Sequence, residues 1–224
     1  MWTGRRGEAA GELTPEQIEQ WHRRISPPEN ELPAGVALTV LLGRTDDAAV
    51  GITQVEAFST GFRFTLAVRV RQARSRLPGG GLFTLISSHA HPGVEIPLED
   101  RLLLGIEYPD GRRASTLHDL RMAGPAAGDD STPLMLVQQG GGGSEQSVDQ
   151  AYWVAPLPPA GPMTVVLAWP GFGMPESRTV LDGGAIHAAA AHSHVLWPPQ
   201  SVTAPAPLPT PPRPSSGWFA QPPD

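Results

Sequence analysis

The chain has 224 residues, a formal net charge of -6 and a pI near 5.6, with 26 prolines, 25 glycines and no cysteine. All 16 basic residues are arginines, so the chain lacks the lysine of a Schiff base or P-loop, and it also lacks any thiol nucleophile or thiolate metal ligand. The negative charge argues against a nucleic-acid binder, whose affinity depends on neutralising phosphates.

The N-terminal arm, residues 1–31, is expected to contain one short helix. Thr14 is a suitable cap and Pro15 suits the first helical position. The helix would carry an apolar stripe formed by Ile18, Trp21 and Ile25. We expect this helix to dock Trp21 onto the body of the protein. The arm shows no apolar signal-peptide core, and no segment reaches the roughly 20 apolar residues of a membrane helix, so we expect a soluble, cytoplasmic protein.

The segment Phe62–Arg71 alternates between apolar and polar residues, which predicts a strand with one buried face and one charged face. Similar segments follow it along the chain. The expected strands are Val36–Leu42, Val50–Phe58, Phe62–Arg71, Leu82–Ser87, Leu102–Tyr108, Arg112–Leu117, Leu134–Gln138, Ala151–Leu157, Met163–Trp169 and Glu176–Leu181. This succession without alternating helices predicts an all-β fold, an antiparallel β-sandwich of Ig-like or jelly-roll type, over residues 32–197.

The sandwich domain is expected to end in a second helix, and the chain in a disordered tail. Asp182 is a suitable cap for an alanine-rich helix that spans Ala185 to Leu196. The glycine run Gly140–Gly143 is interpreted as part of a flexible loop or a wide hairpin. Residues 198–224 contain ten prolines and are expected to be extended and disordered.

Histidines are the most conspicuous reactive side chains. The segment His89-Ala90-His91-Pro92-Gly93-Val94-Glu95 has the form H-x-H-x3-E and resembles the first metal-binding motif of the cupins. The resemblance implies an enzyme that holds a divalent metal with His89, His91 and Glu95. The alternative is that these histidines lie on an exposed loop, because Pro92 favours a loop there. In that case the chain has no cofactor.

Two features suggest contact with a protein partner. Arg63, Arg69 and Arg71 share the polar face of one expected strand, where they could meet an acidic partner, or acidic residues of a neighbouring strand could neutralise them across the sheet. Trp218 and Phe219 form an apolar pair in the tail. They either pack on their own domain or dock into a partner.

The sequences of three segments resemble those of actinobacterial β-sandwich proteins without an assigned function. These segments are Tyr152–Pro170, Leu103–Arg112 and Gly140–Gly143. The resemblance implies the sandwich fold and a bacterial cytoplasmic setting, and it carries no activity. Trp153 and Trp169 lie in one of these segments and are expected either in the core or, if exposed, on a sugar-binding platform.

The pattern as a whole predicts a non-catalytic β-sandwich that acts as a protein-interaction or assembly module. Its partner is an unknown protein rather than nucleic acid or membrane, and a homo-oligomer is compatible with this role. The two alternatives are a metal-dependent, cupin-like enzyme and a carbohydrate-binding sandwich. An interaction module should leave an apolar patch or an edge strand open.

Overall fold

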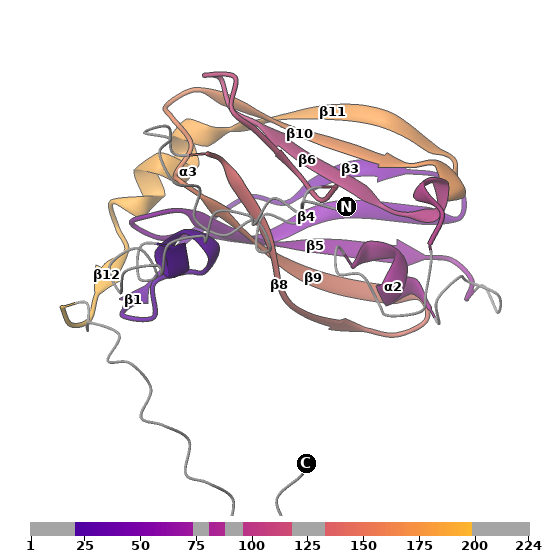
Figure 1. Cartoon of the computed structure of the whole chain (residues 1–224), viewed down its shortest axis with the longest axis horizontal. Coiled ribbons are helices and arrows are strands. Elements are labelled where there is room, and N and C mark those ends of the chain that lie inside the picture. Colours follow the sequence, from indigo (N-terminus) through magenta and orange to yellow (C-terminus); the bar gives the residue numbers. More distant parts are fainter. Residues whose placement is uncertain (1–20, 74–80, 88–95, 118–132, 199–224) are drawn as a thin grey trace, which may run out of the picture.

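The computed structural model of the chain describes residues 21–73, 81–87, 96–117 and 133–198. These residues form two antiparallel sheets that pack face to face (Figure 1), so the predicted all-β sandwich is confirmed. The larger sheet has six strands in the order β2-β4-β5-β9-β8, and β3 also pairs with β4. The smaller sheet has four strands in the order β11-β10-β6-β7.

The elements mostly follow the alternating segments of the sequence within a few residues of the expected bounds, but the expected strand Val36–Leu42 is divided, because residues 37–39 are not in a strand. The larger sheet consists of β2 (Ala34–Val36), β3 (Val40–Arg44), β4 (Ala48–Ala57), β5 (Phe62–Val70), β8 (Met135–Gly143) and β9 (Ser147–Ala155). The smaller sheet consists of β6 (Leu103–Glu107), β7 (Arg113–Ser115), β10 (Pro162–Trp169) and β11 (Met174–Asp182). The remaining elements are a two-stranded pair of β1 (Glu31–Leu32) and β12 (His194–Val195), the helices α2 (Leu82–Ile86) and α3 (Gly183–Ala190), and the 3-10 helices η2 (Leu98–Asp100) and η3 (Pro170–Phe172).

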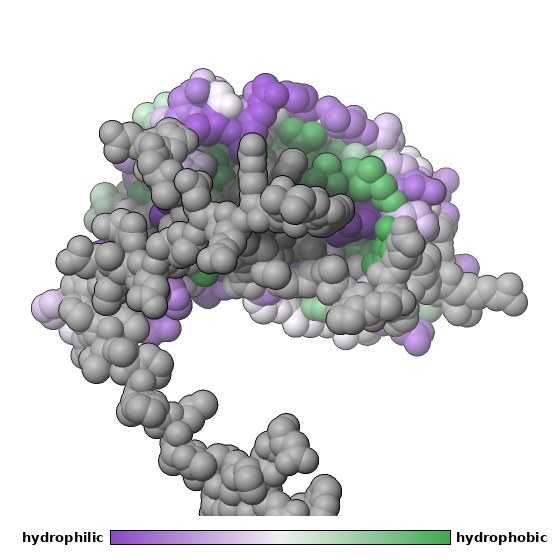
Figure 2. All heavy atoms as spheres, viewed as in Figure 1, coloured by the Kyte–Doolittle hydropathy of each residue, from purple (hydrophilic) through white to green (hydrophobic). Residues whose placement is uncertain are grey.

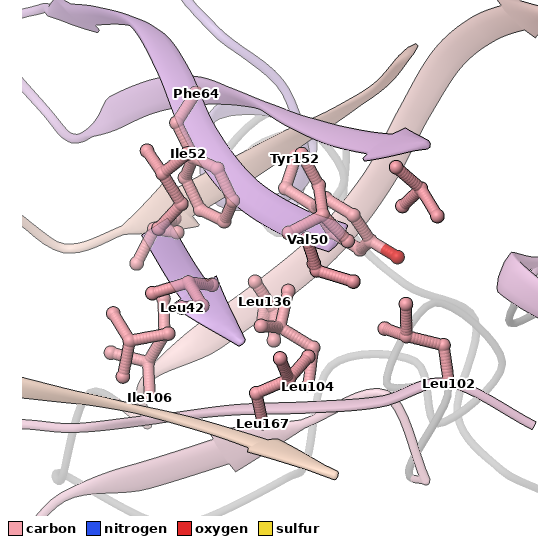
Figure 3. Close-up of a cluster of buried hydrophobic side chains, with 14 of the residues drawn as sticks. Leu42, Val50, Ile52, Phe64, Leu102, Leu104, Ile106, Leu136, Tyr152 and Leu167 are labelled. Carbon is pink, nitrogen blue, oxygen red and sulfur yellow. The ribbon is translucent and has the colours of Figure 1, made fainter. Parts of the chain in front are cut away.

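The main core lies between the two sheets (Figure 3). Strand β5 runs through the middle of the larger sheet, and every second side chain from Phe62 to Val70 points into this core. Leu66 and Val68 are 0% exposed. Leu104 of the smaller sheet faces the larger sheet in the same cluster. The alternation read from the sequence therefore marks the buried face correctly.

A second, smaller core lies on the outer face of the larger sheet. Residues 21–25 are helical, and Trp21 and Ile25 pack there against Trp153 and its apolar neighbours on β8 and β9. The indole N–H of Trp153 donates to the backbone oxygen of Arg24 at 3.0 Å. The prediction that this helix docks Trp21 onto the sandwich is confirmed.

The segment Leu82–Ile86 is a helix, so the predicted strand there is wrong. Leu82, Leu85 and Ile86 are buried, and their spacing of three and four residues places them on one face of a helix. The backbone N–H of Ser87 donates to the oxygen of Phe83 at 3.0 Å, which closes the last turn.

The second helix is confirmed but shorter than expected. Asp182 caps α3, and its carboxylate accepts a hydrogen bond from the N–H of Ala185 at 3.2 Å. The helix ends at Ala190 and not at Leu196, because His194 already belongs to strand β12, where it pairs with Leu32. Among the residues that the structure describes, no helix is long and apolar enough to cross a bilayer.

The glycine run Gly140–Gly143 belongs to strand β8, so the interpretation as a flexible loop is wrong and that of a hairpin is correct. The run leads into a tight connection to β9, where the N–H of Ser144 donates to the oxygen of Ser147 at 2.6 Å. A strand therefore continues through four residues that have poor intrinsic strand propensity, because β9 supplies its hydrogen-bonding partner.

Candidate functional site: an apolar groove on the smaller sheet

The outer face of the smaller sheet carries a groove of about 530 Å³. Three rows of outward-facing residues cross the sheet there, as the pairing of the strands shows. The middle row is Arg178, Val166, Gly105 and Ser115, from β11 to β7. In Figure 2, hydrophobic residues lie over the region of β6 and β10, with hydrophilic residues above them.

Small side chains form the floor of the groove. Gly105 lies at its centre, between Val166 of β10 and Ser115 of β7. A Cβ atom built on Gly105 would lie 3.6 Å from the Cβ of Val166 and 3.5 Å from the backbone oxygen of Ala114, both ordinary contact distances. The hollow therefore exists because a side chain is missing there, and the surrounding backbone leaves room for one.

Apolar residues bound the other parts of the groove. Leu103 and Ala168 pair across β6 and β10 next to the central row. Leu117, which follows β7, is 51% exposed and lines the groove together with Pro133 and Leu134. An apolar surface of this kind gains free energy when another apolar group removes it from water.

An ion-pair network crosses one end of the groove. Arg113 donates from Nε and Nη2 to Oε1 of Glu107 at 3.1 and 2.7 Å, and Arg178 donates from Nη1 to Oε2 at 3.1 Å. Glu176 adds a longer contact, 3.8 Å from its Oε1 to Nε of Arg178. Glu107 thus joins β6 to β7 and, across β10, to β11, with charges of both signs at the rim.

The arginines also shift the titration of Glu107. The hydrogen bond from Arg113 is the largest cause that lowers the pKa of Glu107 below its ordinary value, partial desolvation opposes it, and the hydrogen bond from Arg178 adds to the lowering. Glu107 is therefore ionised at neutral pH and serves as the acceptor of the network.

The arginines predicted as a partner-binding face lie on the outer face of the larger sheet. Arg63 forms an ion pair with Glu56 of β4 at 2.5 Å, and Arg69 with Asp149 of β9 at 2.8 Å. Neutralisation across the sheet, one of the two alternatives, is therefore confirmed for this pair of arginines. Arg71 is exposed at the end of β5, and its backbone N–H donates to the oxygen of Asp47 at 2.7 Å.

The other predicted site residues lie outside the described part of the chain. These residues are His89, His91 and Glu95 of the H-x-H-x3-E motif and Trp218 and Phe219 of the tail. Among the described residues, no group of three or more His, Cys, Asp or Glu side chains is placed to hold a metal ion. The metal site and the tail contact therefore stay predictions.

The two tryptophans considered for a sugar-binding platform are both core residues. Trp153 and Trp169 are 0% exposed. The indole N–H of Trp169 donates to the backbone oxygen of Asp100 at 3.0 Å, and its ring lies 4.0 Å from that of Phe172, centroid to centroid. Neither ring presents a face on which a sugar could stack.

The groove residues were not among the sites predicted from the sequence. The alternation of Leu103, Gly105 and Glu107 does place these three on one face of a strand, and this was the available signal. Their neighbour Val166 is distant in the sequence, so only the order of the strands reveals the groove. A comparison with known proteins finds no matching family model, no matching curated protein and no matching solved structure.

Proposed function

We propose that the chain is a non-catalytic protein-interaction module, and that the groove on the smaller sheet is the surface that receives the partner. The observation that carries this proposal is the apolar floor around Gly105, which no described segment of the chain covers, next to a rim that carries charges of both signs. The proposed occupant is a peptide segment of another protein. It would place apolar side chains over Gly105, Val166 and Ala168, and polar groups near Arg113 and Arg178.

The openness of the groove favours a protein segment over a small molecule. Small-molecule sites usually enclose most of the ligand surface. This groove lies on the outer face of a sheet, and its rim side chains, Arg113 and Arg178, are 69% and 55% exposed. A partner that brings its own surface can cover such a face, whereas a small ligand would remain largely in water.

The larger sheet shows that an apolar outer face of this protein can be covered by peptide. Its apolar end, around Trp153, is covered by the helical residues 21–25 through Trp21 and Ile25. Peptide side chains of the same kind, presented by another protein, suit the floor of the groove on the smaller sheet.

A selection from a displayed peptide library on the full-length chain tests this proposal. Peptides that bind the groove should lose affinity for a Gly105→Leu variant, because the new side chain fills the floor without a backbone clash. We expect a loss of about tenfold or more, measured by fluorescence anisotropy.

Gly35→Leu is the matched control. Gly35 is exposed on β2 of the larger sheet and has nothing within 4 Å of an added Cβ, so this variant gains the same apolar side chain far from the groove. Binding to the control should equal binding to the wild type. The proposal is wrong if no peptide is enriched, or if the enriched peptides bind Gly105→Leu as tightly as the wild type.

A further inference from the structure

Most edge strands of the two sheets carry a feature that discourages pairing with another chain. Strands β2 and β7 are only three residues long. Strand β11 carries Pro175, Glu176 and Arg178. Strand β3 lies beside β11, where the hydroxyl of Ser177 donates to the oxygen of Leu42 at 3.2 Å. Short length, proline, charge, β-bulges and cover are the means by which natural sheets protect their edges.

Strand β8 has one of these protections, a register shift between Gln138 and Gly141, and its final residues 141–143 have none among the described residues. It is nine residues long, contains neither proline nor a charged residue, and pairs only with β9 among the described strands. Its second half, Gly140–Gly143, is exposed. Glycine has no side chain of its own that could shield the backbone there.

The hydrogen-bonding pattern shows which backbone groups of this edge are not hydrogen-bonded to β9. Ser144 donates to Ser147 at the hairpin, and Val70 donates to Gln146 on the other side of β9. Hydrogen-bonded pairs alternate in an antiparallel ladder, so the backbone groups of Gly142 point toward Asp149. Those of Gly141 and Gly143 point outward.

The four glycines differ in whether the fold requires them. A Cβ atom on Gly141 would lie 2.8 Å from Cδ of Gln150, and one on Gly143 would lie 2.8 Å from Cα of Val148, so both positions exclude a side chain. Gly140 and Gly142 have nothing within 4 Å of an added Cβ. The fold of one chain therefore leaves these two positions open, and glycine in a strand is typical of a site where another backbone approaches closely.

We propose that two copies of this chain pair through strand β8, antiparallel, around a two-fold axis at Gly142. The outward N–H and C=O groups of Gly141 then form hydrogen bonds with those of Gly143 in the second copy. The two-fold axis generates the reciprocal pair, in which Gly143 bonds Gly141 of the second copy. Gly142 faces its own counterpart across the axis as a pair without mutual hydrogen bonds, at the closest backbone distance in the ladder. This pairing joins the two larger sheets into one.

A second copy suits this edge better than a foreign peptide. Strand addition by a foreign peptide gains its specificity from pockets for alternate side chains, and four glycines provide none. A two-fold pairing needs only that the β8 edge of one copy fits the same edge of a second copy. The contact is small, so we expect association that is weak and depends on concentration.

Sedimentation velocity of the full-length chain over a range of concentrations tests the proposal. The wild type should approach twice the 23.8 kDa of one chain as the concentration rises. Gly142→Lys and Gly142→Glu should each weaken the dimer by about tenfold or more, because like charges then face each other across the axis. An equimolar mixture of the two variants should restore it, because opposite charges then meet there.

Gly35→Lys is the matched control and adds the same charge to an open, exposed glycine on the opposite edge of the same sheet. It should dimerise like the wild type, and circular dichroism should show all variants folded. A monomeric wild type, or dimers that persist in both Gly142 variants, contradicts the proposal. A mixture that stays monomeric contradicts the placement of the axis at Gly142. Because the groove lies on the other sheet, none of these results bears on the proposed peptide binding.

Discussion

The outer faces of the two sheets differ in whether a described segment of the chain covers them. On the larger sheet, Trp153 and its apolar neighbours point outward at one end and are covered by the helical residues 21–25. On the smaller sheet, Gly105, Val166 and Ala168 point outward, and a groove of about 530 Å³ lies above them. Both surfaces are apolar, but only the first is covered by a described segment of this chain.

The difference follows from the size of the outward side chains. Trp153 offers a large apolar area whose burial repays the ordering of residues 21–25. Glycine and alanine offer little area of their own, and they create a hollow that a partner's side chains can fill. The covered face therefore contributes to stability, whereas the hollow face is the one that we propose binds a partner.

Substitutions on the two faces should differ most in their effect on unfolding. Trp153→Ala removes a fully buried aromatic side chain, and we expect a loss of about 4 kcal/mol in the free energy of unfolding. Val166→Ala, on the floor of the groove, should lose about 1 kcal/mol or less. Urea denaturation of both variants measures the difference. Equal losses would mean that the face of the smaller sheet is buried as well.

Weakening the cover that residues 21–25 form should have an intermediate effect on the free energy of unfolding. Trp21 is partly buried against the cluster around Trp153, so Trp21→Ala should cost about 2 kcal/mol, roughly half the loss for a fully buried tryptophan. The indole N–H of Trp153, which donates to Arg24, should then exchange faster with solvent. Hydrogen exchange followed by NMR measures this rate, and an unchanged rate would contradict the role of residues 21–25 as a cover.

A substitution in the charged rim of the groove should have the smallest effect on fold stability, and this effect should depend on pH. The hydrogen bond from Arg113 lowers the pKa of Glu107 below its ordinary value of 4.5, so the ionised carboxylate stabilises the fold above that value. This contribution is lost as the pH falls through the lowered pKa.

A Glu107→Gln variant measures the rim contribution. The difference in thermal midpoint between the wild type and this variant should be largest near neutral pH and should shrink in acid. A difference that stays constant down to acid pH would mean that the ion pairs contribute nothing to stability.

Much of the fold could be predicted from the sequence because period-two alternation is a local property. Phe62–Arg71 shows this most clearly, since each apolar residue of that segment that the alternation assigned to the core is buried. The segment Leu82–Ile86 was mistaken for a strand because a short apolar run fits both periods. The spacing of Leu82, Leu85 and Ile86 would have distinguished the helix from a strand.

The groove could not be predicted because it depends on the order of the strands. Glu107 and Arg178 are 71 residues apart in the sequence, yet they pair across β10. The arginines on β5, which the sequence did single out, are largely neutralised within their own sheet by Glu56 and Asp149. Composition shows that a charge is present, but only the fold shows which charges remain available to a partner.

The stability of Gly105→Leu tests most directly whether the groove is open in the folded chain. The variant should unfold within about 0.5 kcal/mol of the wild type, because the new side chain enters empty space. Gly51→Leu is the matched control on the larger sheet, where a Cβ would lie 2.8 Å from the oxygen of Val40, and it should lose about 1–3 kcal/mol. A comparable loss in Gly105→Leu would show that the chain already fills its own groove, and would contradict the proposal that a partner occupies it.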